Sequence, residues 1–170
     1  MSSADALETR PLRSPPKFIV DLSQVDMDQA MVSRASLEER IPHRGVMSLL
    51  DGVIWHDDKY KQGVAIKRVQ NDEFWVPGHF PGRPILPGVM MIEAGAQLAS
   101  FLFHCRRNDD CIAGFTRIEN AVFRGQVVPG QDLVVLAREV KYQPRRFISD
   151  IQGIVSDRLV FEARITGMVI

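Results

Sequence analysis

The sequence predicts an α+β fold in which one long apolar helix packs against an antiparallel sheet. Residues 88 to about 106 are apolar on nearly every side, as in a helix buried at the centre of a domain. Several long segments after this helix alternate between apolar and polar residues, and short turns separate them. Successive strands joined by tight turns are antiparallel, so the pattern indicates α+β rather than alternating α/β.

The first 35 residues are predicted to be an extension that precedes the domain. Residues 1–16 are polar and contain proline, so they bury little surface and are expected to be disordered. Residues 17–22 are expected to form a short strand or a segment that docks onto the domain. The organised domain is expected to occupy residues 36–170.

A short helix is expected to open this domain. Ser36 and Glu39 have the spacing of a capping box, and Pro42 disfavours continuation of the helix. Residues 47–55 are expected to turn into a strand, and residues 63–69 alternate like a second strand. The later strands are expected over residues 111–117, 119–128, 131–142, 146–156 and 158–169.

Composition excludes several classes of function. The formal net charge is zero, so no global field directs the protein to nucleic acid or to a membrane surface. Cys105 and Cys111 lack a second cysteine pair, so no zinc framework is predicted. Two cysteines and no recognisable secretion signal favour the cytoplasm. The apolar run includes Glu93, Gln97 and His104, which predicts a core helix rather than a membrane span.

The loop before the long helix presents one histidine, His79. Residues 76–88 contain four prolines and three glycines, so the loop is stiff at some positions and permissive at others. Such a loop can hold His79 at a fixed angle beside a ligand. The alternative is a loop histidine that caps a carbonyl group, and the composition of the loop favours neither interpretation.

The long helix carries a carboxylate in apolar surroundings. Glu93 and Gln97 are four residues apart and share one face, where the amide can orient the carboxylate. A carboxyl group in such surroundings is harder to ionise, as a general acid near neutral pH requires. The alternative is a structural ion pair, with Arg117 or Arg124 as the partner.

The start of this helix adds a third element. Pro87 suits the first turn, and Gly88 brings no side chain that would block access. The free N–H groups and the helix dipole favour a carbonyl oxygen that gains negative charge. His79, Glu93 and Gly88 thus supply a base, an acid and an oxyanion site, a combination that suits proton abstraction next to a thioester carbonyl.

These segments resemble a known enzyme family. The stretches GHFPG (78–82), RPILPGVMMIE (83–93) and AGAQ (94–97) closely resemble the 3-hydroxyacyl-[acyl-carrier-protein] dehydratases of type II fatty acid synthesis, including the spacing of fourteen between His79 and Glu93. IPHR (41–44), AVFRGQVVPG (121–130) and the final strand pairs are also similar to this family. Glu rather than Asp at position 93 is similar to the branch that dehydrates without isomerising.

The resemblance implies a hotdog fold, which is an antiparallel sheet wrapped around one long central helix. It implies a homodimer whose sheets join edge to edge, with three dimers able to form a hexamer. His79 of one subunit would meet Glu93 of the other in a narrow acyl tunnel at the interface. Four apolar residues are candidates for lining that tunnel, with ordinary core packing as the alternative: Phe80, Ile85, Met90 and Met91.

The resemblance also implies a reaction and its site residues. The substrate would be a (3R)-hydroxyacyl thioester on the pantetheine arm of acyl carrier protein, and the product a trans-2-enoyl thioester. His79 would remove the proton at C2, and Glu93, directly or through a water molecule, would protonate the hydroxyl that leaves from C3. The N–H of Gly88 would polarise the thioester carbonyl while Gln97 orients Glu93. Such a hydro-lyase is expected to need no metal and no organic cofactor.

Five further residues are candidates for structural or carrier-binding roles. His43 and Arg44 match the Pro-His-Arg segment of the family, and we expect a structural role at the turn, through capping or ion pairing. Arg124, Arg145 and Arg146 are candidates for meeting an acidic carrier protein, because basic patches steer acidic partners. A solvated charged face is the alternative for each of these three arginines.

Other functions remain open at this point. A hotdog thioesterase would share the scaffold but usually lacks the His–Glu pair. A non-catalytic acyl-binding subunit would not be expected to retain His79, Glu93, Gln97 and Gly88 together. A paralogue that serves polyketide or special lipid synthesis would have the same chemistry with a different carrier protein.

Overall fold

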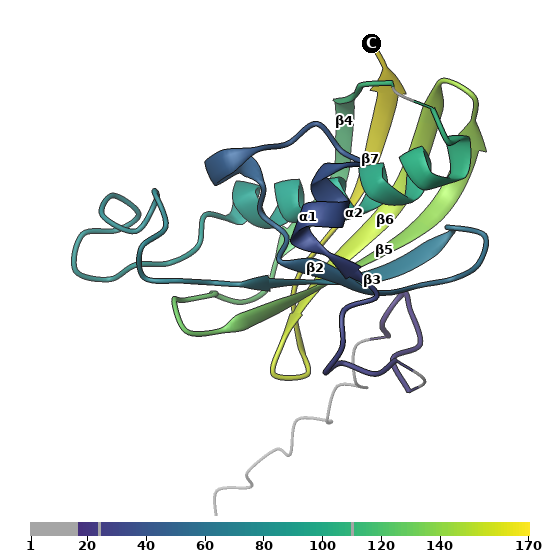
Figure 1. The fold of residues 1–170 in the computed structure, drawn as a ribbon. Helices are drawn as coiled ribbons and strands as arrows, with labels where there is room; N and C mark the ends of the chain where they lie inside the picture. The colour runs from purple at the N-terminus through teal and green to yellow at the C-terminus, as the bar shows by residue number, and fades with distance from the viewer. Residues whose placement is uncertain (1–16, 24, 110) are drawn as a thin grey trace, which may run out of the picture.

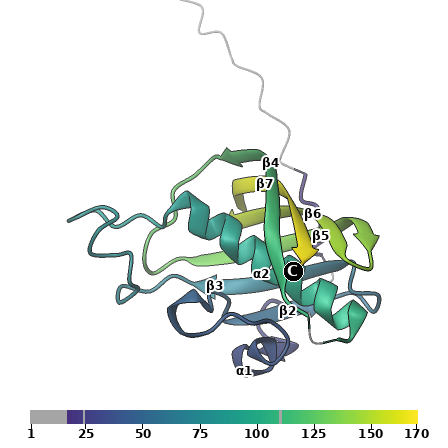
Figure 2. The ribbon, with the colours of Figure 1, turned by 90° about the horizontal axis from the view of Figure 1, so that it is seen from above.

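The computed structural model describes residues 17–23, 25–109 and 111–170 (Figure 1). Seven strands form one sheet in the order β1-β2-β3-β5-β6-β7-β4. The long helix α2 (Gly88–Arg107) lies across one face of the curved sheet, as Figures 1 and 2 show. The predicted α+β class is therefore confirmed, as is the arrangement of an antiparallel sheet around a long central helix.

All neighbouring strands in the sheet are antiparallel. The turn between the last two strands places Ser156 and Asp157 at positive φ, a geometry that matches the twist of a hairpin. The bounds of the elements other than α2 are β1 Val32–Ser33, α1 Arg34–Glu38, the 3-10 helix η1 Gly45–Met47, β2 Gly52–His56, β3 Gln62–Arg68, β4 Ala113–Phe123, β5 Asp132–Gln143, β6 Arg146–Val155 and β7 Arg158–Val169.

Helix α2 lies close against the sheet because small residues face it. A Cβ atom added to Gly95 would lie 2.6 Å from Cδ1 of Ile151 on β6, so a larger residue there would push the helix away. Leu98, Phe101 and Phe161 are buried in the same core. The helix is long and apolar enough to cross a membrane, but 72% of its apolar window is buried within the domain, as in a core helix.

The predicted capping box at Ser36 and Glu39 is wrong. Ser33 is the N-cap, and its Oγ accepts a hydrogen bond from the N–H of Ser36 at 3.2 Å. Glu39 instead lies at the C-terminal cap of α1. The helix begins earlier because Ser33, which ends β1 in an extended conformation, already supplies the capping oxygen.

The two strands predicted over residues 111–117 and 119–128 form a single strand, β4. Its pairing with β7 shifts register twice, between Phe115 and Arg117 and between Glu119 and Val122. Asn120 adopts a positive φ of 54° inside the second shift. Asparagine tolerates this conformation, so the strand bends at a bulge without ending.

The segment formed by residues 17–23 and 25 covers the outer face of the sheet, opposite α2 (Figure 1). Val20 is only 2% exposed and packs with Val64, Leu136 and other apolar residues of β2, β3, β5 and β6. The backbone N–H of Ile19 donates to Oε1 of Gln152 at 2.9 Å. Residues 17–22 therefore dock rather than form a strand, whereas the disorder predicted for residues 1–16 lies outside the described residues. The division at residue 36 stays a prediction.

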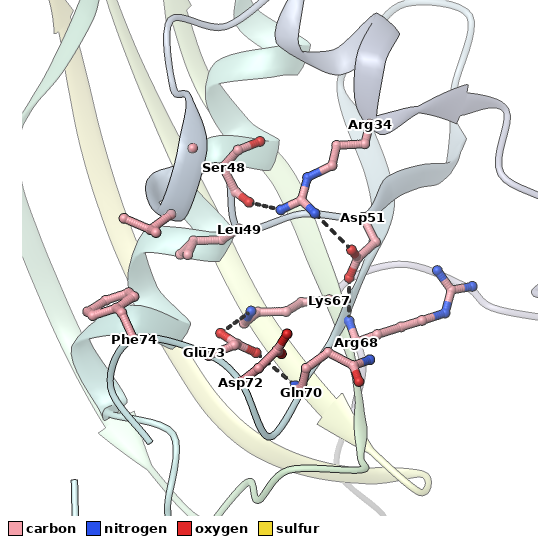
Figure 3. Close-up of a pocket in the computed structure, with 12 residues that line it drawn as sticks. Arg34, Ser48, Leu49, Asp51, Lys67, Arg68, Gln70, Asp72, Glu73 and Phe74 are labelled. Atoms are coloured by element: carbon pink, nitrogen blue, oxygen red, sulfur yellow. Dashed lines mark hydrogen bonds and ion pairs between the residues drawn. The ribbon is translucent and has the colours of Figure 1, made fainter. Parts of the chain in front are cut away.

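The long loop that follows β3 is anchored by one carboxylate, that of Glu73 (Figure 3). Nζ of Lys67 donates to its Oε2 at 2.8 Å, the N–H of Gln70 donates to its Oε1, and Nε1 of Trp75 donates to Oε2. Burial by itself would raise the pKa of Glu73, but these hydrogen bonds and the charge of Lys67 outweigh it, so the pKa is lowered. Lys67 is only 4% exposed, so this pair links the loop to the sheet.

Glu73→Gln should destabilise the protein at pH 7 by about 3 kcal/mol, because it leaves the buried ammonium of Lys67 without a counter-charge. Since the folded pKa of Glu73 is lowered, its ionisation stabilises the fold above its unfolded pKa of about 4.3. This contribution is lost as the pH falls through the lower folded pKa. Chemical denaturation of both proteins between pH 7 and pH 3 measures the difference, which should shrink toward the acid end.

Glu119→Gln is a matched control, because Glu119 pairs with Arg117 at 3.3 Å in an exposed position. Exposed pairs contribute roughly 0–1 kcal/mol, so this variant should stay close to the wild type. Equal losses in the two variants would show that Glu73 is not an anchor.

Val20→Ala should lower the free energy of unfolding by about 2 kcal/mol, because it removes apolar contacts from the docked segment. Val46→Ala provides the control, since Val46 is 69% exposed and its truncation should cost little. Thermal unfolding of the two variants beside the wild type checks this. Equal stability of wild type and Val20→Ala would mean that the segment does not contribute to the folded domain.

Candidate active site

The loop before α2 closes around His79. The carbonyl oxygen of Trp75 accepts from the N–H groups of Gly78 and His79, at 3.1 and 2.9 Å. The N–H of Ile85 donates to the carbonyl oxygen of His79 at 2.8 Å. Because Trp75 is itself held by Glu73, the position of His79 is linked through hydrogen bonds to Lys67 on β3.

The hydrogen bond to its ring determines which nitrogen of His79 is free. Nδ1 lies 2.7 Å from the carbonyl oxygen of Ile85. A carbonyl oxygen only accepts, so Nδ1 carries the hydrogen and the lone pair of the neutral ring is on Nε2. The ring stacks on Phe80 at a centroid distance of 4.2 Å, and the peptide bond between these two residues is cis. His79 thus caps a carbonyl group with one nitrogen and keeps the other available as a base.

Glu93 lies on the first half of α2 and is held by Gln97. Nε2 of Gln97 donates to Oε1 of Glu93 at 3.0 Å and to the carbonyl oxygen of Met47 at 2.7 Å. Oε1 of Gln97 accepts from the N–H of Leu49 at 3.0 Å. Gln97 is completely buried, and its three partners leave the amide one orientation. The carboxylate is therefore aligned by a side chain that is fixed by the backbone at the end of η1 and just after it.

His43 provides a second contact to the same carboxylate, which sequence reasoning did not assign. Its Nε2 lies 3.2 Å from Oε1 of Glu93. The two residues are fifty positions apart, so no local spacing could have indicated the contact. The proposed arginine partners of Glu93 are wrong, because Arg117 pairs with Glu119 and Arg124 pairs with Glu162.

A cavity of about 110 Å³ opens beside Glu93 and His43, between α2 and strands β4, β6 and β7. Its walls are mostly apolar, which would suit an acyl chain more than a charged ligand. The other residues that line it are Ala96, Ser100, Ala113, Gly114, Phe115, Phe147 and Gly167.

The start of α2 is covered on one side by an aromatic ring. Gly88 is the first helical residue, where N–H groups have no acceptor within the helix. A Cβ atom added to Gly88 would lie 2.8 Å from the ring of Phe123, at the end of β4. Glycine at this position therefore allows the ring to approach the helix terminus.

The other predicted site residues fall into different environments. Phe80 is exposed beside His79, Ile85 and Met90 are partly buried, and Met91 lies in the core. The residues that line the cavity at Glu93 do not include these four or His79. Their assignment to an acyl tunnel stays a prediction.

A second cavity of about 300 Å³ is lined by residues of η1, of the segment that follows it and of the loop after β3 (Figure 3). Ser48 and Leu49 line it, and its charged residues are largely paired, with Arg34 against Asp51 at 3.4 Å and Lys67 against Glu73. Within the described part of the chain, no three His, Cys, Asp or Glu side chains are grouped so that they could hold a metal ion.

Comparisons with known proteins give a consistent result. Residues 41–164 match the family model of the FabA-like domain. The chain is 36% identical over 131 residues to 3-hydroxyacyl-[acyl-carrier-protein] dehydratase FabZ of Ralstonia nicotianae, covering 75% of this chain and 79% of the relative. It is 37% identical over 139 residues to the FabZ of Alkaliphilus metalliredigens, covering 79% and 92%.

A solved structure shows the same fold. The dehydratase heterocomplex ApeI:P from Xenorhabdus doucetiae superposes with a TM-score of 0.70 at 16% identity, covering 79% of this chain and 90% of that one. The family match spans well over half of the chain and includes the segments that carry His79 and Glu93. The chain therefore belongs to the FabA-like family of hotdog proteins, among the 3-hydroxyacyl-[acyl-carrier-protein] dehydratases called FabZ.

Proposed function

We propose that this protein removes water from (3R)-hydroxyacyl-[acyl-carrier-protein] and forms trans-2-enoyl-[acyl-carrier-protein] in fatty acid biosynthesis. The observation that carries the proposal is the similarity to FabZ dehydratases over a region that includes both His79 and Glu93. The hydrogen bonds that hold these two side chains support it, because a proton-transferring group must be positioned before it reacts.

In the first half of the reaction, Nε2 of His79 takes the proton from C2 of the acyl chain. Nδ1 is already committed to the carbonyl oxygen of Ile85, so Nε2 holds the lone pair that can accept this proton. The N–H of Gly88, at the start of α2, would stabilise negative charge on the thioester oxygen.

In the second half, Glu93 donates its proton to the hydroxyl group at C3. The C3–O bond breaks, water leaves, and the electron pair from the C2–H bond forms the double bond. Glu93 ends as a carboxylate and His79 as an imidazolium. Transfer of one proton from His79 to Glu93 returns both groups to their starting states. The reaction oxidises or reduces no group of the protein. The groups of the protein that take part are the base, the acid and the start of α2.

We also propose that the partner is a second copy of this chain, paired along β4. This strand lies at the end of the sheet order, and most of its residues are exposed on both faces. Such an edge usually needs cover, because it presents free backbone groups and apolar side chains. The exposed apolar side chains of β4 are Phe115, Ile118, Val122 and Phe123.

A dimer of this kind would bring His79 of one subunit to Glu93 of the other. The cavity at Glu93 borders β4, the proposed interface strand, which supports a composite site. Acyl carrier protein in the cytoplasm would be the substrate carrier. Arg145 and Arg146 at the turn between β5 and β6 are the candidates for meeting it, since Arg124 is already paired with Glu162.

The first test is a mass-spectrometric assay on (3R)-hydroxybutyryl and longer hydroxyacyl carrier proteins. The wild type should produce species lighter by one water, while His79→Ala should lose at least about 100-fold in kcat, because general base catalysis is removed. Circular dichroism should show that the variant is folded. Full activity of His79→Ala would contradict the mechanism, and no water loss by the wild type with any chain length would contradict the function.

A second test asks whether the site is shared between subunits. His79→Ala and Glu93→Gln should each be inactive alone, but co-expression should restore about a quarter of wild-type activity, because half of the dimers would hold one intact site. The same assay on separately purified and co-expressed samples measures this. If co-expression restored nothing although mass spectrometry showed mixed dimers, both residues would belong to the same subunit's site.

A further inference from the structure

We propose that His43 is a positioning residue that determines which oxygen of Glu93 carries the acidic proton. In this arrangement Nε2–H of His43 donates to Oε1 of Glu93, so the proton given to the substrate sits on Oε2. The inference deepens the proposed function, because it rests on Glu93 as the acid of a dehydratase.

The turn that carries His43 is held from both sides. Ile41 is buried in the core, and Nη1 of Arg44 donates to the carbonyl oxygens of Ile41 and His43 at 2.6 and 2.8 Å. The arginine therefore closes the turn onto itself. His43 projects from a rigid support toward α2, as required for a side chain that orients another one.

Two donors converge on one oxygen of Glu93. Nε2 of Gln97 lies 3.0 Å from Oε1, and Nε2 of His43 lies 3.2 Å from the same atom. An oxygen that accepts two N–H groups has no room for its own hydrogen on the same side. A protonated Glu93 would therefore carry its hydrogen on Oε2.

The surroundings of the other ring nitrogen assign the tautomer of His43. Nδ1 is buried and meets no hydrogen-bonding group among the residues that the structure describes. A buried N–H without an acceptor is rarer and costlier than an acceptor without a donor. The hydrogen of the neutral ring is therefore placed on Nε2, which faces Glu93.

Gln97 alone would hold the carboxyl group less firmly. The terminal torsion of a glutamate side chain is broad, so one hydrogen bond leaves the two oxygens free to exchange places. Gln97 has no second hydrogen to donate to Glu93, because the other hydrogen of its amide nitrogen is donated to the carbonyl oxygen of Met47. The second donor, from His43, is what would prevent the exchange.

The test compares two amide substitutions that differ in where they place a donor. The amide nitrogen of Gln can occupy the place of Nε2 of histidine, whereas that of Asn corresponds to Nδ1. His43→Gln should thus keep the donor to Oε1, and His43→Asn should lose it. His43→Ala leaves no polar group at either nitrogen position of the ring. His56→Asn is a control for changing a partly buried histidine elsewhere.

His43→Asn and His43→Ala should lower kcat by about ten-fold, the effect of one lost hydrogen bond, while KM stays within about two-fold. His43→Gln should recover kcat to within about three-fold of the wild type. Thermal unfolding should show that the Gln and Asn variants are equally stable. This pattern separates positioning from a structural role, which would affect the two amides alike.

Three results would overturn the inference. They are full activity in all His43 variants, equal loss of kcat in folded Gln and Asn variants, and a rise in KM with unchanged kcat. The second would mean that the ring itself exchanges protons with Glu93 or only fills space.

A readout that does not depend on turnover keeps the two proposals apart. In protein with ¹⁵N-labelled histidine, NMR should show His43 with hydrogen on Nε2, and Glu93→Leu should shift that nitrogen signal while Glu119→Gln should not. If the wild type dehydrated no substrate but this coupling were present, the proposed function would fail and the contact would stand. Hydrogen on Nδ1 of His43 in an active enzyme would overturn the inference alone.

Discussion

The buried amide of Gln97 is the interaction on which the rest of the site depends. It bonds the carbonyl oxygen of Met47, the N–H of Leu49 and the carboxylate of Glu93, so it joins the end of η1 and the residues just after it to the middle of α2. The same segment follows the turn that carries His43. A completely buried amide must satisfy its polar atoms within the protein, and this requirement orients Glu93.

Much of the fold could be predicted because its strongest signals are local. The apolar run after Gly88 predicted α2 almost to the residue, and alternation predicted the last three strands. Prediction was wrong where two local signals competed. Ser33 and Ser36 are both residues that can cap a helix. The helix begins after Ser33 because Ser33 is held in an extended conformation by the pairing of β1 with β2.

The candidate site could also be predicted only in part from the sequence. The contact between Glu93 and Gln97 follows from helical spacing, but that between His43 and Glu93 arises only when a turn and a helix fold together. The prediction divided β4 at residue 118, whereas the structure carries one strand through two register shifts, the second of them at Asn120. Contacts between subunits, such as the proposed one between His79 and Glu93, lie beyond any reading of one chain's periodicity.

The segment that covers the outer face of the sheet also decides where attachments to the protein can be tolerated. Residues 17–23 and 25 run along the side of the sheet that faces away from α2, the helix that carries Glu93 (Figure 1). A label or an immobilising surface joined directly to Lys17 would thus lie on the face of the sheet away from α2 and the candidate site. Immobilisation through the amino-terminal side should leave a large carrier protein free to reach the helix.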